Sequence, residues 1–261
     1  MAAKAQPSTA IAHPTADRVI VRGFDLAQEL IGSATTTDYF YVLITGSKPT
    51  AVQTNILDAC IVALAEHGLV PSVQAARMTY AASPEALHGA VAAGLLGAGS
   101  VILGSSEDSA HLLASIVEDA AANDRPIDAT AKDAVRKLRA AHQPVPGVGH
   151  PLHREEDPRA TALLAYAKAH GVSGPHTRAL AAVVDAVPEI YGRRLPLNVS
   201  GAIPAVLLDA DFPARAIKGI PLIGRTMSLV AHLLEEQETP IGFALADAAE
   251  KAVDYTGPIP S

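Results

Sequence analysis

The chain is 261 residues long, which is enough for one large domain or for two closely packed ones. Hydrophobic residues make up 49% of it and its mean hydropathy is +0.23, a composition that excludes an intrinsically disordered protein. The formal net charge of −7 argues against a nucleic-acid binder, and the single cysteine, Cys60, excludes an internal disulfide and a cysteine-based metal cluster.

The N-terminal segment, residues 1–20, predicts a flexible arm. Prolines interrupt it and it holds no continuous apolar stretch, so it does not have the pattern of a secretory signal peptide. The longest apolar run, GIPLIGRTMSLVAHLL, carries an arginine and a histidine and is too short to span a bilayer. We therefore expect a soluble, cytoplasmic protein that has no membrane partner.

Helical signals follow one another along the rest of the chain. Thr50 is an expected N-cap, and Cys60 lies in the apolar pattern that follows, where it is expected to be a buried core thiol. Ser83 and Asp157, each followed by proline at the first helical position, mark two further helix starts. No alternating pattern longer than DRVIVRG indicates a strand, so we expect an all-α fold. The expected helices cover residues 35–49, 50–68, 71–82, 83–99, 105–123, 128–142, 157–171, 174–192, 199–211, 213–237 and 244–253.

The segment PGVGHPLHREEDPR, residues 146–159, has the most distinctive chemistry. Its glycines let the backbone approach a ligand closely, and His150 follows them directly. Arg159 lies in the first turn of a helix capped by Asp157, where free N–H groups and a guanidinium together suit a carboxylate or a phosphate. The alternative is a solvated loop whose charges have no function.

Arg225 and His232 lie seven residues apart, on one face of a single helix. Apolar flanks predict that Arg225 is partly buried and needs an anionic partner, which is either a protein carboxylate or a bound acid. His232 is better explained as a satisfied core histidine. His67 ends an apolar helix, where capping and ligand contact are equally compatible with its position. His88 is expected to pack between helices, and the remaining histidines apart from His150 are expected on exposed faces: His13, His111, His142, His153, His170 and His176.

Other signatures are missing from the sequence. It contains no Walker loop, dinucleotide fingerprint, HExxH or GxSxG motif, and the spacing of histidine, cysteine and carboxylate residues suggests no metal site.

Together and in this order, these segments resemble the citrate synthase superfamily, with the closer likeness to citryl-CoA lyases and to the lyase module of ATP-citrate lyase. GVGHPLHREEDPR is similar to the family's G-x-G-H…D-P-R segment and LNVSG to its N-V-D segment. LAEHG followed by AAR is similar to its histidine segment, and IGRTMSLVAHLLEEQ to its late arginine helix. The likeness covers about residues 20–258.

The resemblance implies an all-α homodimer with the active site in a cleft between two subdomains. The unit over residues 21–261 would divide into a large subdomain, about 21–108 plus 206–261, and a small subdomain, about 109–205. The resemblance also implies that a coenzyme A (CoA) thioester and a keto acid are the small-molecule partners, with no tightly bound cofactor and no metal.

Site residues carry over by position. His67, Arg159 and Arg225 are expected to bind carboxylate or carbonyl oxygens, and His150 to act on the alcohol or carbonyl oxygen as an acid–base or polarising group. Ser200 stands at the family's third catalytic position. The expected CoA contacts come from the backbone of the loop 145–149 and from a nearby arginine: Val145, Gly147, Val148, Gly149 and Arg154.

Ser200 is the main departure, because the family has there the aspartate that exchanges a proton with the acetyl carbon. A serine hydroxyl is a poor base by itself. Three explanations are open. Ser200 positions a water molecule, or a nearby acid (Glu107, Asp108 or Asp209) carries out the proton exchange in its place, or the substrate differs from that of the family. Ser200 is also compatible with a plain N-cap of the helix that follows.

Two further departures bear on the substrate. Leu103 stands at or next to the place of a histidine that citrate synthases have and the lyase module lacks, which favours a lyase. The segment 239–251 has no arginine, although relatives offer one there to the partner subunit's substrate. The leading hypothesis is therefore a carbon–carbon lyase of the citryl-CoA lyase type. Its rivals are a condensing enzyme on another acyl-CoA and keto acid, and a catalytically silent CoA- or dicarboxylate-binding protein.

Overall fold

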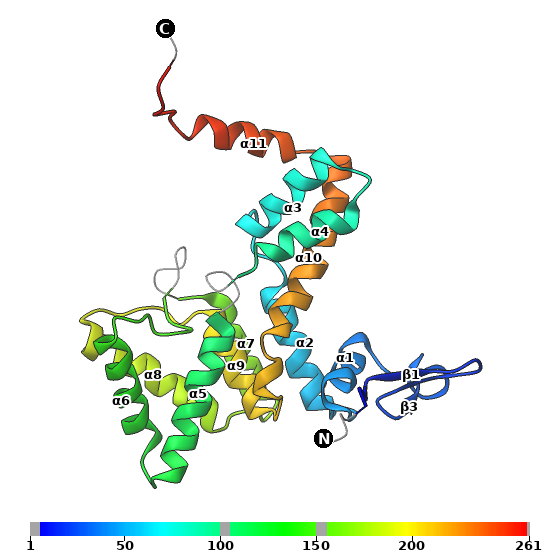
Figure 1. Ribbon diagram of the computed structural model, residues 1–261. Helices are drawn as coiled ribbons and strands as arrows, with labels where there is room; N and C mark the ends of the chain where they lie inside the picture. The colour runs from blue at the N-terminus through cyan, green and yellow to red at the C-terminus, as the bar shows by residue number, and fades with distance from the viewer. Residues whose placement is uncertain (1–5, 100–104, 150–155, 260–261) are drawn as a thin grey trace, which may run out of the picture.

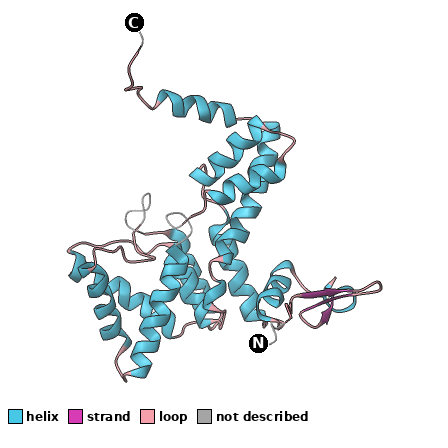
Figure 2. Ribbon diagram, in the orientation of Figure 1, coloured by secondary structure: helices cyan, strands magenta, loops and turns pink. Residues whose placement is uncertain are grey.

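The computed structural model describes residues 6–99, 105–149 and 156–259, and most of them are helical (Figure 2). The expected helical fold is confirmed, with the addition of a small antiparallel sheet near the N-terminus. Its strands, β1 (Ala12–Pro14), β2 (Val19–Val21) and β3 (Phe24–Asp25), lie in the order β1-β2-β3. Strand β1 falls within the segment 1–20, for which no element was expected, and β2 lies in the alternating run DRVIVRG, across the end of that segment.

The long helices α2 and α10 lie at the centre of the arrangement, with helices α5 to α9 on one side and α1 and the small sheet on the other (Figure 1). Helices α3 and α4 pack against the second half of α10, and α11 projects from the end of that group. The elements after the sheet are η1, a turn of π-helix (Leu26–Leu30), α1 (Thr36–Thr45), α2 (Ala51–Ala65), α3 (Pro71–Ala82), α4 (Leu87–Leu96), α5 (Ser105–Ala122), α6 (Ile127–Ala140), α7 (Pro158–Ala169), α8 (Pro175–Tyr191), α9 (Val199–Asp209), the 3₁₀ turn η2 (Ala214–Ala216), α10 (Gly219–Glu238) and α11 (Gly242–Lys251).

Local capping chemistry explains several helix starts. Thr50 caps α2 in a reciprocal capping box with Gln53, and Asp157 caps α7, as the sequence predicts. The prediction for α4 is wrong. This helix begins at Leu87 rather than at Pro84, because the Ser83 hydroxyl donates to the Glu85 carboxylate in a turn instead of capping a helix.

Helix α9 lies between the two largest apolar clusters. One cluster joins α1, α2, α7, α9 and α10, and Cys60 is fully buried in it, as expected. Burial raises the pKa of this thiol, which keeps it protonated. The other cluster joins α5, α6, α8 and α9. Because α9 has core on both sides, its residues are buried from Val199 to Leu207, apart from the half-buried Ser200.

A third, smaller cluster joins α3, α4 and α10. The division into a large and a small subdomain stays a prediction. No helix in residues 6–99, 105–149 or 156–259 combines the length and the apolar character needed to cross a membrane.

The start of α8 depends on a carboxylate from the end of α9. Asp209 accepts hydrogen bonds from the backbone N–H groups of Gly174, His176 and Thr177 at 2.7–2.9 Å, and from His176 Nδ1 at 2.8 Å. Burial acts to raise the pKa of Asp209, but these hydrogen bonds outweigh it and lower the pKa from 3.8 to about 2.

The substitution Asp209→Asn is expected to lower the free energy of unfolding by about 2 kcal/mol at neutral pH. The folded-state pKa of Asp209 lies below its unfolded value, so this stability is fully present above about pH 4 and is lost as the pH falls through about 2. Urea unfolding at pH 7 and pH 3 measures it. Asp211→Asn is the control, because Asp211 is exposed and its φ of +59° suits asparagine. A difference that does not shrink at pH 3 would contradict the assignment.

Candidate active site

The glycine loop, residues 145–149, pairs with the chain that leads into α9. Val148 forms an isolated antiparallel bridge with Leu197, and the Gly149 N–H donates to the Pro196 carbonyl at 2.7 Å. Gly147 and Gly149 both have positive φ angles, +78° and +95°. The sequence therefore needs glycine at both places to follow this path.

The same loop lies directly against the first turn of α9. A Cβ atom on Gly147 would lie 2.5 Å from the Cα of Gly201, so the two backbones meet where neither residue has a side chain. Asn198 strengthens this contact, because its N–H donates to the Gly147 carbonyl and its Nδ2 to the Gly149 carbonyl. The predicted CoA loop and Ser200, the neighbour of Gly201, are thus held together.

Asp157 joins the starts of α7 and α9. Its fully buried carboxylate accepts from the Arg159 N–H, from Arg159 Nε at 3.0 Å and Nη2 at 2.9 Å, and from the Val199 N–H at 3.0 Å. Burial acts to raise the pKa of Asp157, but these hydrogen bonds and the charge of Arg159 lower it overall. The sequence predicts the cap on α7. It does not predict the hydrogen bond to Val199, because the two residues are 42 positions apart.

Arg225 lies buried on α10 and has unsatisfied donors. The residue is 2% exposed, and its Nε and Nη1 have no hydrogen-bond partner among the described residues. Burial lowers the pKa of Arg225, Glu66 acts in the opposite direction, and repulsion from Arg159 lowers it further. Two guanidinium groups close enough to repel each other, one with free buried donors, form a site suited to an anion such as a carboxylate.

His67 follows α2 on a short extended segment. The helix ends at Ala65, and the carboxylate of Glu66 accepts from the N–H groups of both His67 and Gly68. The Glu66 carboxylate also accepts from Ser228 and His232, which places this segment beside α10, the helix that carries Arg225. Glu66 is a site residue that sequence reasoning missed, and the available signal was an acid directly before His-Gly at a helix end.

Ser200 is the second residue of α9 rather than its N-cap, which is Asn198, so the N-cap interpretation is wrong. Of the acids considered as replacements, Asp209 lies nine residues further along the helix, about 13 Å away at 1.5 Å per residue, and its carboxylate is occupied at α8. Glu107 pairs with Lys218 at 2.7 Å, and Asp108 is exposed.

Other histidines differ from their predicted surroundings in two cases. His88 is exposed on α4 rather than packed between helices. His176 is partly buried against Asp209 rather than exposed. His232 is satisfied, as expected, by contacts with Glu66 and Arg77. Four residues lie outside the described part of the chain, so their expected roles and surroundings stay predictions: Leu103, His150, His153 and Arg154.

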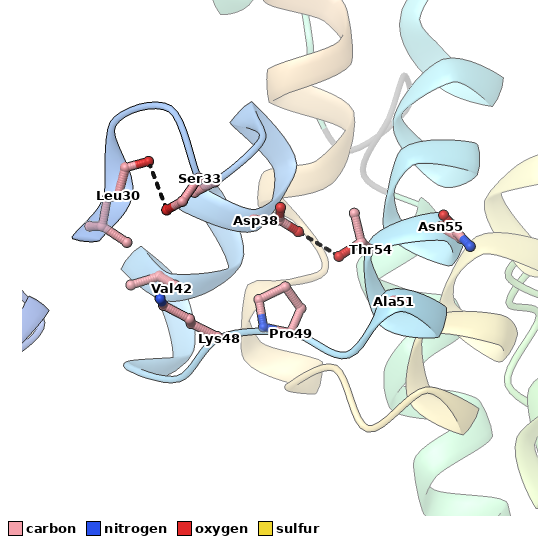
Figure 3. A pocket seen from close by; sticks show the side chains of 10 residues that line it. Leu30, Ser33, Asp38, Val42, Lys48, Pro49, Ala51, Thr54 and Asn55 are labelled. Atoms are coloured by element: carbon pink, nitrogen blue, oxygen red, sulfur yellow. Dashed lines mark hydrogen bonds between the residues drawn. The ribbon is translucent and has the colours of Figure 1, made fainter. Parts of the chain in front are cut away.

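Two cavities were compared with this arrangement. A pocket of about 380 Å³ between η1, α1 and α2 contains none of the predicted site residues (Figure 3). Asp38 on its wall accepts from Thr54, and the Ser33 hydroxyl is bonded to backbone carbonyls. A larger cavity of about 790 Å³ also has none of the predicted site residues in its lining, which comes from residues 194–197, from Glu156 and Thr161 around the start of α7, and from α8. Two of its lining residues, Pro196 and Leu197, pair with the glycine loop, so this cavity adjoins that loop.

A metal ion has no evident ligand set here. Within the part of the chain that the structure describes, no group of three or more histidine, cysteine, aspartate or glutamate side chains is placed to hold one.

Comparison with known proteins shows the family. Residues 10–242 match the model of the citrate synthase C-terminal domain. The chain is 29% identical over 239 residues to the putative citrate synthase 2 of Mycobacterium tuberculosis and spans 59% of that relative's length.

Solved structures extend the similarity. The citryl-CoA lyase from Hydrogenobacter thermophilus superposes with a TM-score of 0.86 at 30% identity, over 97% of this chain and 96% of the lyase. The ATP citrate lyase from Methanothrix soehngenii, solved with citrate and coenzyme A, shares the fold with a TM-score of 0.80 at 20% identity, over 99% of this chain and 43% of that one. The chain therefore belongs to the citrate synthase family.

Proposed function

We propose that the protein is a carbon–carbon lyase of the citryl-CoA lyase type, which cleaves citryl-CoA or a related 3-hydroxyacyl-CoA to a keto acid and acetyl-CoA. The observation that carries the proposal is the pair of arginines, Arg159 and Arg225. A buried guanidinium with unpartnered donors is costly unless an anion binds it, and a citryl group brings carboxylates. The similarity to the Hydrogenobacter thermophilus lyase over nearly the full length of both chains supports this class.

The reaction fits the residue types. A base removes the proton of the tertiary alcohol, the carbonyl of the keto acid forms, and the adjacent C–C bond breaks. Its electron pair passes to the thioester as an enolate, which then takes up a proton at carbon. His150 would serve the alcohol oxygen, and Arg159 and Arg225 would hold the carboxylates.

The CoA part has a site in the same proposal. The glycine loop, residues 145–149, would offer its backbone to the adenine, and Arg154 would meet the phosphates. The neighbouring cavity of about 790 Å³ is of the size that ligand pockets usually have.

A second copy of the chain is the proposed protein partner. Four apolar side chains of α10 are each at least 38% exposed, and the last three follow one another at spacings of three and four residues: Leu222, Met227, Val230 and Leu234. Helix α11 projects from the body with exposed Phe243 (Figure 1). Exposed apolar faces of this kind are typical of subunit interfaces, which supports a homodimer.

Ser200 and the lack of an arginine in α11 favour one rival, a condensing enzyme that joins another acyl-CoA to a keto acid. Ser200 alone also favours a silent protein that binds CoA or a dicarboxylate. Incubation with acetyl-CoA and longer acyl-CoA esters plus oxaloacetate, pyruvate or glyoxylate separates these possibilities from the lyase.

The purified protein is expected to release oxaloacetate and acetyl-CoA from citryl-CoA, and His150→Ala and Arg159→Lys are each expected to lower kcat/KM by at least about 100-fold. Lysine keeps the positive charge near Asp157, but its single ammonium group cannot donate two parallel hydrogen bonds to a carboxylate as a guanidinium does. Coupled assays for both products measure this, with Arg136→Ala as the control because Arg136 is exposed on α6. Unchanged turnover in both site variants would refute the site.

A further inference from the structure

Glu66 occupies an unusual position between two elements that carry site residues. Its Oε1 accepts from the N–H of His67 at 2.8 Å and from that of Gly68. Its Oε2 accepts from the Ser228 hydroxyl and from His232 Nε2 at 3.1 Å. One carboxylate therefore fixes the segment after α2 and, at the same time, two side chains of α10.

The two α10 partners lie on the same helix face as Arg225. Ser228 follows Arg225 by three residues and His232 follows Ser228 by four, so the three side chains form one row. Glu66 binds the second and third members of this row and lies close enough to Arg225 to influence its pKa. The position of His67 relative to Arg225 is thus set through this carboxylate.

Arg77 on α3 fixes the orientation of the imidazole in this contact. Its Nη1 lies 3.4 Å from His232 Nδ1, and because arginine has only donors, this contact favours the tautomer in which Nδ1 accepts and Nε2 carries the proton. That proton points at Glu66. The Arg77 guanidinium is itself held by Glu236 and Glu235.

The four hydrogen bonds of the Glu66 carboxylate are not explained by a contribution to the stability of the fold. The Glu66 side chain is 51% exposed, and exposed carboxylates contribute little to the free energy of unfolding. The contacts instead restrict where His67 can lie. Burial acts to raise the pKa of Glu66, but the hydrogen bonds from Ser228 and the backbone lower it, which keeps the carboxylate ionised.

We propose that Glu66 is a positioning residue: bonded to Ser228 and His232 on one side and to the His67–Gly68 backbone on the other, it holds His67 in register with Arg225. The proposal rests on the proposed function in one respect, that His67 and Arg225 act on the same substrate. Glu66 itself need not touch the substrate.

Two substitutions separate the two sides of this carboxylate. Glu66→Ala removes every contact, so exchange of the His67 and Gly68 amide hydrogens is expected to accelerate at least about 10-fold and kcat/KM to fall by about 100-fold. Glu66→Gln keeps one oxygen for the two amides but turns an NH₂ group toward α10. It is expected to leave amide exchange close to wild type and still to lower kcat/KM, by less than Glu66→Ala.

Glu85→Ala is the matched control. Glu85 also accepts from a serine hydroxyl, at 2.6 Å, but at the opposite end of α3. It is expected to change neither readout. Ser228→Ala, which weakens the link from the α10 side, is expected to lower kcat/KM with little change in melting temperature.

The amide exchange, followed by NMR, keeps this test independent of the substrate. Wild-type exchange rates at His67 and Gly68 in Glu66→Ala would overturn the positioning role, whether or not the protein cleaves citryl-CoA. A kcat/KM within twofold of wild type in Glu66→Ala would overturn it as well. Accelerated exchange in a protein whose wild type turns over no substrate would support the positioning of His67 and refute the proposed function instead.

Discussion

Replacing Arg77 by methionine is expected to lower the free energy of unfolding by about 3–5 kcal/mol. Arg77 is 2% exposed, and its Nε lies 2.6 Å from Oε2 of Glu236, whose side chain is 1% exposed. Without the guanidinium, the Glu236 charge remains buried, and the partners left to it among the described residues are the N–H groups of Ile241 and Gly242. The anchoring of α11 would weaken with it, because Arg77 Nη2 also donates to the Thr239 carbonyl at 3.0 Å.

Urea unfolding of Arg77→Met measures this effect, and hydrogen exchange in α11 shows whether that helix loosens first. Arg136→Met is the control, because Arg136 is 55% exposed and its ion pairs with Asp133 and Glu189 are expected to contribute at most about 1 kcal/mol. If Arg77→Met lowers the free energy of unfolding by less than about 1 kcal/mol, the buried pair of Arg77 and Glu236 is not needed for stability.

The same substitution at Arg225 is expected to act in the opposite direction. Arg225 is as buried as Arg77, but its Nε and Nη1 have no partner among the described residues and Arg159 repels it. Arg225→Met removes that cost and is expected to raise the free energy of unfolding by about 1–3 kcal/mol. Substrate binding should weaken by about 2–5 kcal/mol, a loss in kcat/KM on the order of 30-fold or more.

Parallel unfolding and activity measurements on Arg225→Met test this opposition between stability and function. Oxaloacetate binding by calorimetry gives the same information without turnover, because the keto acid is the expected anion. If Arg225→Met is destabilised by more than 1 kcal/mol and still binds oxaloacetate normally, Arg225 is a structural residue and the anion site is elsewhere.

Local chemistry made much of the fold predictable. Thr50 and Asp157 cap helices because their side chains reach N–H groups two or three residues away, which a sequence displays directly. Ser83 shows the limit of that reasoning, since its hydroxyl has a competing acceptor in Glu85. The strands β1 and β3 were missed because they have three and two residues, too few to produce a clear alternation, whereas β2 lies in the alternating run DRVIVRG.

The sequence predicted which arginines belong to the site. It did not predict the hydrogen-bond partners of the carboxylates around them. Apolar flanks indicated the burial of Arg225, and motif resemblance indicated Arg159. The roles of Asp209, Asp157 and Glu66 depend on helices that are distant in sequence, and no single segment contains both partners. Asp209 was one of the acids expected near Ser200, whereas its carboxylate is bonded to N–H groups at the start of α8.

The bond between Glu66 and Ser228 spans 162 residues, and the one between Arg77 and Glu236 spans 159. During synthesis, α2 and α3 leave the ribosome long before α10 is made. Until then, Val73 and Ala76 of α3 are not covered by Leu229 and Leu233 of α10, their neighbours in the apolar cluster. Contacts of such long range form slowly. The candidate site is therefore completed last, and a chain that stops before α10 lacks both Arg225 and the two α10 partners of Glu66, Ser228 and His232.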